Sequence, residues 1–140
     1  MMRVVEQRGL WFEEFEADVI YRHAPGRTFG EADNTLFSTL TMNPQALHLD
    51  ADWSSRQPFG ARLVNSMMTL ATLVGLSVEQ LTQGTIVANL GFSEVRFPAR
   101  CTTVTRCGPR PGCCPSDCPA AGRARAWSPW STPVATRTVW

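Results

Sequence analysis

The sequence predicts an α+β domain in which a sheet wraps around one long, mostly apolar helix. Two stretches carry this prediction. Leu63 to Val78 is apolar on almost every side, which is typical of a helix buried on most of its surface. Thr85 to Phe97 alternates loosely between apolar and polar residues and is rich in β-branched ones, which is typical of a strand. Because such a helix needs a cover, more strands are expected after Pro98.

The segment before the long helix predicts a strand and a shorter helix. Val19 to His23 is a candidate strand ahead of a Pro25-Gly26 turn. Thr28 to Glu31 has the form of a capping box, with a hydroxyl at the N-cap and a carboxylate at the third helical position. A helix from Glu31 to Thr41 should follow. Its core-facing apolar stripe would consist of Ala32, Leu36, Phe37 and Leu40.

The chain between the two helices is predicted to be loop. Pro44 breaks the first helix, so Thr41 to Asp50 becomes a loop or short turn that carries His48. Asp52 to Gly60 is polar and irregular. Asn65 or Ser66 can cap the long helix.

The end of the long helix has its own signals. Ser77 to Gln80 offers a second capping box, which leads into a short turn ended by Gly84. Gly91 predicts a bulge or bend in the strand that follows.

Composition changes abruptly at Ala99. All five cysteines and six of the ten prolines follow it, whereas Asp117 is the one acidic residue of twelve found there. The chain uses arginine to the exclusion of lysine, which suggests a GC-rich coding sequence. We therefore predict two parts, with residues 1–99 as the N-terminal part of a folded domain and residues 100–140 as a disordered tail.

Charge and hydropathy exclude several classes of function. The net charge of +1 gives no electrostatic basis for nucleic-acid binding. Charged residues such as Arg3, Glu6 and Arg8 interrupt the N-terminal segment, so no signal peptide is predicted. The most apolar stretch, 63–78, contains too many polar residues to cross a bilayer. We expect a cytoplasmic protein with neither nucleic-acid nor membrane partners.

Four runs of residues carry a resemblance to a known family. They are GRTFGEADNTLF (26–37), Asn43 to Asp50, FGARLVNSM (59–67) and VRFPA (95–99). Together they resemble the MaoC-type acyl-CoA hydratases, which have the hot-dog fold. The resemblance implies an antiparallel sheet around the long central helix, truncated after about Ala99. Within the family, TMNPQALHLD followed by FGARLVNS most resembles the branch that hydrates mesaconyl-type or methylmalyl-type CoA thioesters.

The resemblance implies a catalytic role for His48. The family places an Asp and a His five residues apart, as the pair that activates water and moves the proton. Here that first position is Asn43, and a neutral amide can orient a water but cannot accept its proton. Gln45 is a further departure, because the family usually has Asn there. Either His48 is the only general base, or Asp50 contributes, or the activity is reduced or altered. Gln45 and Asp50 are candidate auxiliary groups.

The resemblance also implies an oxyanion site at the start of the central helix. The family uses a backbone N–H there, and the matching residues are Asn65, Ser66 and Met67. N–H groups at a helix N-terminus polarise a thioester carbonyl and stabilise an enolate. Arg96 is a candidate contact for a CoA phosphate or a substrate carboxylate. No metal and no separate cofactor are implied, because CoA is part of the substrate.

Each of these residues also has an ordinary structural interpretation. A single histidine between two leucines is more often structural than catalytic. Asn65 can be only a helix cap, and Met67 fits a core position. Arg96 can be a solvated arginine at a strand end. His23 has no motif around it.

Three interpretations are open for residues 100–140. A metal or disulfide module is disfavoured, because the five cysteines form no C-x-x-C pair, no histidine accompanies them and their number is odd. A natural disordered tail accords with the many prolines, although Trp127, Trp130 and Trp140 are unusual in a solvated segment. The third interpretation is out-of-frame translation.

Back-translation with GC-rich codons favours the third interpretation. The loss of one base after Ala99 turns a family-like PVHHGDTLRAET into RCTTVTRCGPRP, which is Arg100 to Pro111. The same offset, applied from Ala126 to Val139, recovers VVTVEHPGRNQDG, which resembles the closing strand of the family. We predict that the chain from Arg100 onward is translated out of frame.

These expectations leave two main classes of function. The first is an acyl-CoA hydro-lyase that acts through His48 and Asn43, in a family whose members are usually homodimers with CoA bound across the interface. The second is a non-catalytic hot-dog remnant that binds CoA or nothing. A hot-dog thioesterase normally needs a carboxylate that Asn43 and Ser66 do not provide. Because the tail replaces later strands, we expect the chain as written to be unstable and impaired.

Overall fold

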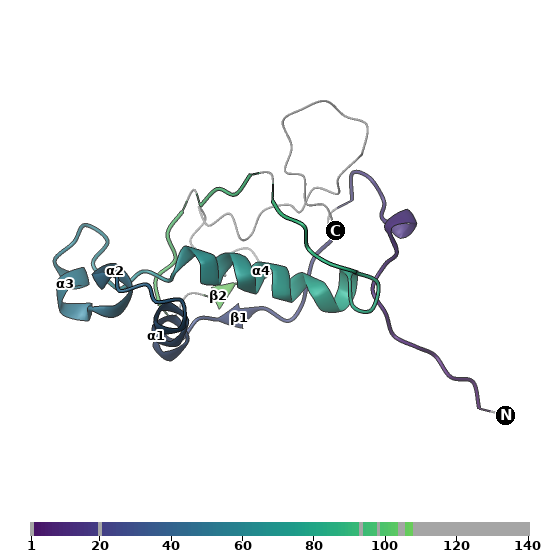
Figure 1. Ribbon diagram of the computed structural model, residues 1–140, viewed down its shortest axis with the longest axis horizontal. Helices are drawn as coiled ribbons and strands as arrows, with labels where there is room; N and C mark the ends of the chain where they lie inside the picture. Colours follow the sequence, from purple (N-terminus) through teal and green to yellow (C-terminus); the bar gives the residue numbers. More distant parts are fainter. Residues whose placement is uncertain (1, 20, 93, 98, 104–105, 108–140) are drawn as a thin grey trace.

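One long helix organises the structure. The computed structural model describes residues 2–19, 21–92, 94–97, 99–103 and 106–107. Helix α4 (Ser66–Leu81) runs along the long axis, with the short helices gathered at its N-terminal end (Figure 1). These are α1 (Glu31–Leu40), α2 (Ala46–Leu49) and α3 (Ala51–Ser55), and a 3-10 helix, η1 (Phe12–Glu14), lies in the N-terminal segment. Within the described part, no helix has the length and hydropathy that a bilayer span requires.

Asn65 sets the start of α4. Its side-chain Oδ1 accepts the Met67 N–H at 3.0 Å, which confirms the predicted cap. The helix therefore covers Ser66–Leu81 and not the predicted Leu63 to Val78. The residues before the cap are extended, since the Val64 N–H donates across the chain to the Cys101 carbonyl at 2.8 Å.

The second capping box, predicted over Ser77 to Gln80, is wrong. The helix continues through these residues, and the Ser77 hydroxyl donates back to the Val74 carbonyl at 2.7 Å. Inside a helix a serine readily bonds a preceding carbonyl in this way, so its hydroxyl is not available as a cap. The predicted turn does follow, and Gly84 adopts a φ of 75°, which favours glycine.

The predicted N-terminal cap of α1 is displaced. The Gly30 N–H donates to the Asp33 carboxylate at 2.9 Å, so the helix is capped at Gly30. Thr28 cannot serve as the cap because it lies in strand β1 (Arg27–Thr28). The Gly30 N–H and the nearby Arg27 guanidinium lower the pKa of Asp33 below its usual value. The boundaries of the helix are otherwise close to the prediction.

Helix α1 buries a different face from the one its apolar residues predicted. Asn34 and Ser38 are its buried residues, whereas Leu36 and Leu40 are 60% and 73% exposed. Of the predicted stripe, Phe37 packs against the core, and Ala32 is exposed. The polar face is buried because Asn34 makes hydrogen bonds to the segments that precede α4.

The loop between α1 and α4 contains more helix than predicted. Helix α1 ends before Pro44, as expected, and His48 lies on the single turn of α2. The prediction that Asp52 to Gly60 is irregular is wrong for its first residues, which belong to α3. Asp50 caps that helix, because its Oδ1 accepts the Trp53 N–H at 2.9 Å.

The sheet seen in the described residues is small. Strand β1 pairs antiparallel with β2 (Arg106–Cys107), and an isolated antiparallel bridge joins Leu63 to Thr102. The strands predicted over Val19 to His23 and Thr85 to Phe97 are absent from the described parts of those segments, in which Ile20 and Ser93 are not described. A strand needs a ladder partner, and neither segment has one among the described residues.

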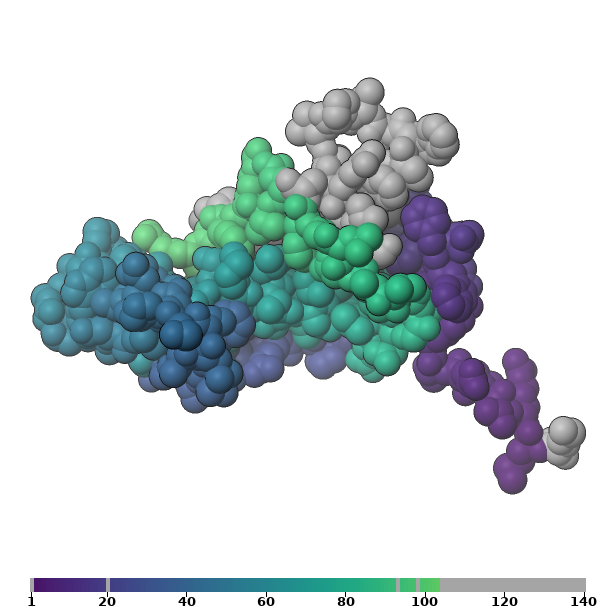
Figure 2. All heavy atoms as spheres, viewed as in Figure 1, coloured from purple at the N-terminus to yellow at the C-terminus, as the bar shows by residue number. Residues whose placement is uncertain are grey.

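The apolar core is also small. Phe29, Val64, Met68 and Cys101 are buried together, and Phe37 and Ala99 pack against them. The prediction that the long helix is buried on most of its surface is wrong for the structure described, where Met68 and Thr69 are the buried residues of α4. Figure 2 shows atoms of α4 at the molecular surface.

Residues just beyond Ala99 take part in this core. Cys101 is 6% exposed, and the Thr103 N–H donates to the Arg62 carbonyl at 3.4 Å. Such backbone pairing depends little on side-chain identity, so it does not by itself distinguish native from out-of-frame sequence. The predicted division at Ala99 stays a prediction, since residues 108–140 lie outside the described part.

The N-terminal segment docks on the C-terminal end of α4. The Gly9 N–H donates to the Gln83 carbonyl at 2.7 Å, and the Leu10 N–H donates to the Leu81 carbonyl at 2.8 Å. Carbonyl groups at a helix end lack intrahelical donors, so these bonds satisfy them.

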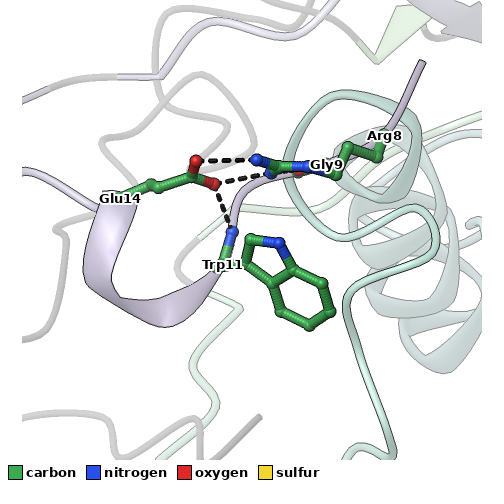
Figure 3. Close-up of polar contacts among 4 residues, drawn as sticks. All are labelled: Arg8, Gly9, Trp11 and Glu14. Carbon is green, nitrogen blue, oxygen red and sulfur yellow. Dashed lines mark hydrogen bonds and ion pairs between the residues drawn. The ribbon is translucent and has the colours of Figure 1, made fainter. Parts of the chain in front are cut away.

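An ion pair braces the turn that follows this docked segment. The Arg8 guanidinium donates two hydrogen bonds, of 2.6 and 2.8 Å, to the Glu14 carboxylate (Figure 3). The Trp11 N–H donates to the same carboxylate at 2.7 Å. Together Arg8 and Trp11 lower the pKa of Glu14 to about 2.

We expect Glu14 to stabilise the N-terminal turn in a pH-dependent way. Because its folded pKa is depressed from 4.5 to about 2, the contribution is fully present above pH 4.5 and is lost as the pH falls toward 2. Titration of the Glu14 carboxyl by NMR should give a midpoint near 2, and the Arg8→Gln variant should move it upward. A midpoint near 4.5 in the unmodified chain would contradict the ion pair.

Candidate active site

A cavity of about 170 Å³ lies where α2, the start of α4 and residues 95–97 and 99–101 meet. Its walls are mostly apolar, with contributions from Leu47, Leu63 and Leu70. The polar residues that line it are His48, Ser66, Thr69, Arg96 and Arg100. Apolar walls with a few polar groups are typical of a site for a small organic substrate.

His48 is held in one orientation at this cavity. The residue is 8% exposed, and its Nδ1 lies 2.9 Å from the Leu63 carbonyl oxygen. Because a carbonyl oxygen only accepts hydrogen bonds, Nδ1 carries the proton. Nε2 of the neutral ring is then the nitrogen with a free lone pair. The ring is therefore prepared to act as a base at Nε2.

Asn34 connects His48 to the start of α4. Its Nδ2 group donates to the His48 carbonyl at 3.1 Å and to the Leu63 carbonyl at 3.0 Å. Its Oδ1 accepts the Asn65 N–H at 2.8 Å. Asn34 is 1% exposed, so its amide group is shielded from water. One buried amide thus joins three segments around the cavity.

The start of α4 presents one of the predicted oxyanion residues to the cavity. Ser66 is the first residue of the helix and lines the cavity. The Met67 N–H is engaged by the Asn65 side chain, and Met67 is 52% exposed. Asn65 itself is buried and acts as the cap. Of the three predicted residues, Ser66 is therefore the one placed to meet a ligand.

The other residues predicted from the loop do not line the cavity. Asn43 Oδ1 accepts the Gln45 N–H at 3.1 Å, which closes a local turn. The Gln45 side chain is exposed. Asp50 is exposed and caps α3. The structure therefore brings His48, Ser66 and Arg96 together and leaves these three outside the walls.

Arg96 lines the cavity but already has a partner. Its Nε donates to the Glu94 carboxylate at 2.5 Å, and its side chain is 77% exposed. It belongs to the rim of the site. Arg100, which also lines the cavity, was not among the predicted site residues.

Sequence reasoning missed Asn34, although the sequence carries a signal for it. Asn34 and Ser38 lie four residues apart in the middle of a helix, where both types are unfavourable unless they find a partner. A polar pair at that spacing marks a face with its own hydrogen bonds. Thr69, also in the cavity wall, carries no such signal.

The fold and the site define a MaoC-like domain. Residues 14–101 match the family described as MaoC like domain, and the chain belongs to that family. Over 74 residues it is 35% identical to 3-hydroxyacyl-thioester dehydratase Z of Mycobacterium tuberculosis. The aligned residues make up 51% of this chain and 49% of that protein. The same figures hold for the protein of that name from Mycobacterium bovis. The chain thus spans about half the length of the curated relatives it matches.

Solved structures support the fold. R-hydratase PhaJ1 from Pseudomonas aeruginosa aligns with a TM-score of 0.58 at 20% identity, covering 69% of this chain and 59% of that one. A MaoC-like dehydratase from Rhodospirillum rubrum aligns with a TM-score of 0.60 at 21% identity, covering 70% and 66%. At such identities the likeness shows the shared fold, which is that of the MaoC-like hot-dog proteins.

Proposed function

We propose that the cavity beside His48 is the site of an acyl-CoA hydro-lyase, which reversibly adds water to a 2-enoyl thioester. One observation carries the proposal: His48, with its proton held on Nδ1 by the Leu63 carbonyl, lines the same cavity as the first residue of α4. A base and a helix N-terminus at one small cavity are the two groups that this reaction needs.

In the proposed reaction His48 Nε2 takes a proton from water while the water oxygen bonds to the β-carbon of the thioester. Electron density moves to the thioester oxygen, and the Ser66 N–H, backed by the α4 dipole, stabilises the resulting enolate. His48 then delivers the proton to the α-carbon. Asn43 does not line the cavity and its Oδ1 accepts the Gln45 N–H, so the proposed reaction assigns it no contact with the water.

The substrate is proposed to have a short acyl chain. A cavity of about 170 Å³ is smaller than the roughly 300–1,000 Å³ of pockets that enclose a drug-sized ligand, so the CoA portion would remain outside. Arg96 at the rim favours an acyl group with a second carboxylate, as in mesaconyl-CoA. The mycobacterial relatives are named as 3-hydroxyacyl-thioester dehydratases, which supports the reaction class.

The activity of the chain as written is proposed to be low. Leu36, Leu40, Val87 and Leu90 are each at least 60% exposed, as expected if strands that cover them in an intact domain are replaced. Homodimer formation, also proposed from the family resemblance, would be impaired with it. Resequencing around the Ala99 codon tests the cause: an intact reading frame shared by close relatives would exclude out-of-frame translation.

The function is tested by assaying the 140-residue chain and a frame-restored chain against crotonyl-, mesaconyl- and methylmalyl-CoA. Enoyl absorbance and free thiol are followed together. We expect enoyl absorbance to change without release of free CoA, and more rapidly in the frame-restored chain. Release of CoA would instead support a thioesterase. Binding without turnover in both chains would support the non-catalytic remnant.

A further inference from the structure

Asn34 is a buried polar side chain, bonded to residues around the cavity, that the proposed reaction does not use. It is 1% exposed, and its amide donates two hydrogen bonds and accepts one. The three partners are 14, 29 and 31 residues away along the chain, and they belong to α2 and to the segment just before α4. A buried amide that is satisfied in this way holds its partners at fixed separations.

Two of these partners, the His48 and Leu63 carbonyls, lie in the surroundings of the proposed base, His48. The His48 carbonyl fixes the turn that carries the imidazole ring. The Leu63 carbonyl accepts both the Asn34 amide and the His48 Nδ1–H, at 3.0 and 2.9 Å. The Leu63–Val64 peptide is also held from its other side, by the Val64 N–H that donates to the Cys101 carbonyl. Loss of the Asn34 bond would leave the Leu63 carbonyl less firmly held toward the ring. The preference of the ring for a proton on Nδ1 would then weaken.

The third partner, Asn65, lies at the start of α4, beside the proposed oxyanion donor. Asn34 Oδ1 accepts the N–H of Asn65, the cap of α4, and Ser66 follows it directly. The same amide therefore touches the segment of the base and the segment of the oxyanion donor.

From this geometry we propose that Asn34 is a positioning residue, which sets the tautomer of His48 and its separation from the Ser66 N–H. The inference rests on the proposed function for its effect on turnover, but its effect on the imidazole does not require any activity.

Asn34→Asp tests the proposal most selectively. The carboxylate keeps an acceptor for the Asn65 N–H but turns the donor of the other two bonds into an oxygen facing two carbonyls. We expect kcat to fall by about 100-fold, as for a displacement of about 1 Å at a reacting group. KM should change by less than about threefold, because contacts outside the cavity bind most of the CoA.

A second measurement separates this proposal from the proposed function. Nitrogen-15 NMR of the imidazole in the 140-residue chain, without substrate, should show a proton on Nδ1 of His48. The Asn34→Asp variant should show a mixture of tautomers. Suppose that neither the 140-residue chain nor the frame-restored chain hydrates any thioester, but that the tautomer of His48 still depends on Asn34. The positioning role then stands and the proposed function fails.

Matched variants keep the test decisive. Ser38→Ala removes another buried polar group from the same face of α1. The Ser38 hydroxyl accepts a weak hydrogen bond of 3.5 Å from Asn65 Nδ2 and makes no bond to the His48 segment. The variant should leave kcat and the tautomer unchanged. Asn34→Ser, which retains a donor for one carbonyl, replaces Asn34→Asp if that variant does not fold. A folded Asn34 variant with unchanged kcat and an unchanged His48 tautomer would overturn the proposal.

Discussion

Replacing His48 with alanine should reduce hydration of a 2-enoyl-CoA by about 10²- to 10⁴-fold, the usual contribution of a general acid–base residue. The ring is 8% exposed and lines the cavity, so its loss removes the only imidazole among the described residues at that site. The measurement is kcat in the frame-restored chain, where turnover is expected to be higher.

His23→Ala is the matched control for this prediction. His23 Nδ1 lies 3.1 Å from Gln80 Oε1 near the surface, and His23 does not line the cavity. Its replacement should leave the rate unchanged. Equal rates for His48→Ala and the unmodified chain would remove His48 from the mechanism.

Replacing Gly9 with alanine should destabilise the fold by about 1–3 kcal/mol, as for other cases of overpacking. A Cβ at Gly9 would lie 2.4 Å from the Thr82 nitrogen and 2.6 Å from the Leu81 carbonyl oxygen. Both are backbone atoms and cannot rotate away. The two hydrogen bonds that dock the N-terminal segment on α4 should therefore be lost. Thermal or urea unfolding measures the change.

Gly75→Ala, in the helix on which the Gly9 segment docks, gives the opposite expectation. A Cβ there meets no other atom within 4 Å, and Gly75 lies in the middle of α4. Alanine has the higher helix propensity, so the variant should gain about 0.5–1 kcal/mol. If Gly9→Ala unfolds at the same denaturant concentration as the unmodified chain, the docking of the N-terminal segment is not as described.

The sequence predicted best those features that depend on neighbouring residues. The apolar run and the Asn65 cap are local, and α4 was placed to within three residues at each end. The face of α1 was mispredicted because its burial depends on bonds from Asn34 to distant carbonyls, which periodicity does not register. The strand at Thr85 to Phe97 failed for a related reason, since a strand is defined by a partner elsewhere in the chain.

The candidate site was also predicted only in part. His48 was predicted from a family resemblance, and it lines the cavity with Ser66. Asp50 and Met67 were predicted from nearby positions in the motif, yet capping interactions engage Asp50 Oδ1 and the Met67 N–H. Asn34 lies outside the motif residues to which the resemblance assigned a role. Its position in the network follows only from the folded structure.

Hydration in water enriched in oxygen-18 tests the central claim most directly. The frame-restored chain is incubated with crotonyl- or mesaconyl-CoA, and the masses of the products are measured by mass spectrometry. The account predicts an intact CoA thioester that carries one heavy oxygen in a new hydroxyl group, and loss of this label in His48→Ala. Heavy oxygen found instead in a free carboxylic acid, together with released CoA, would contradict it.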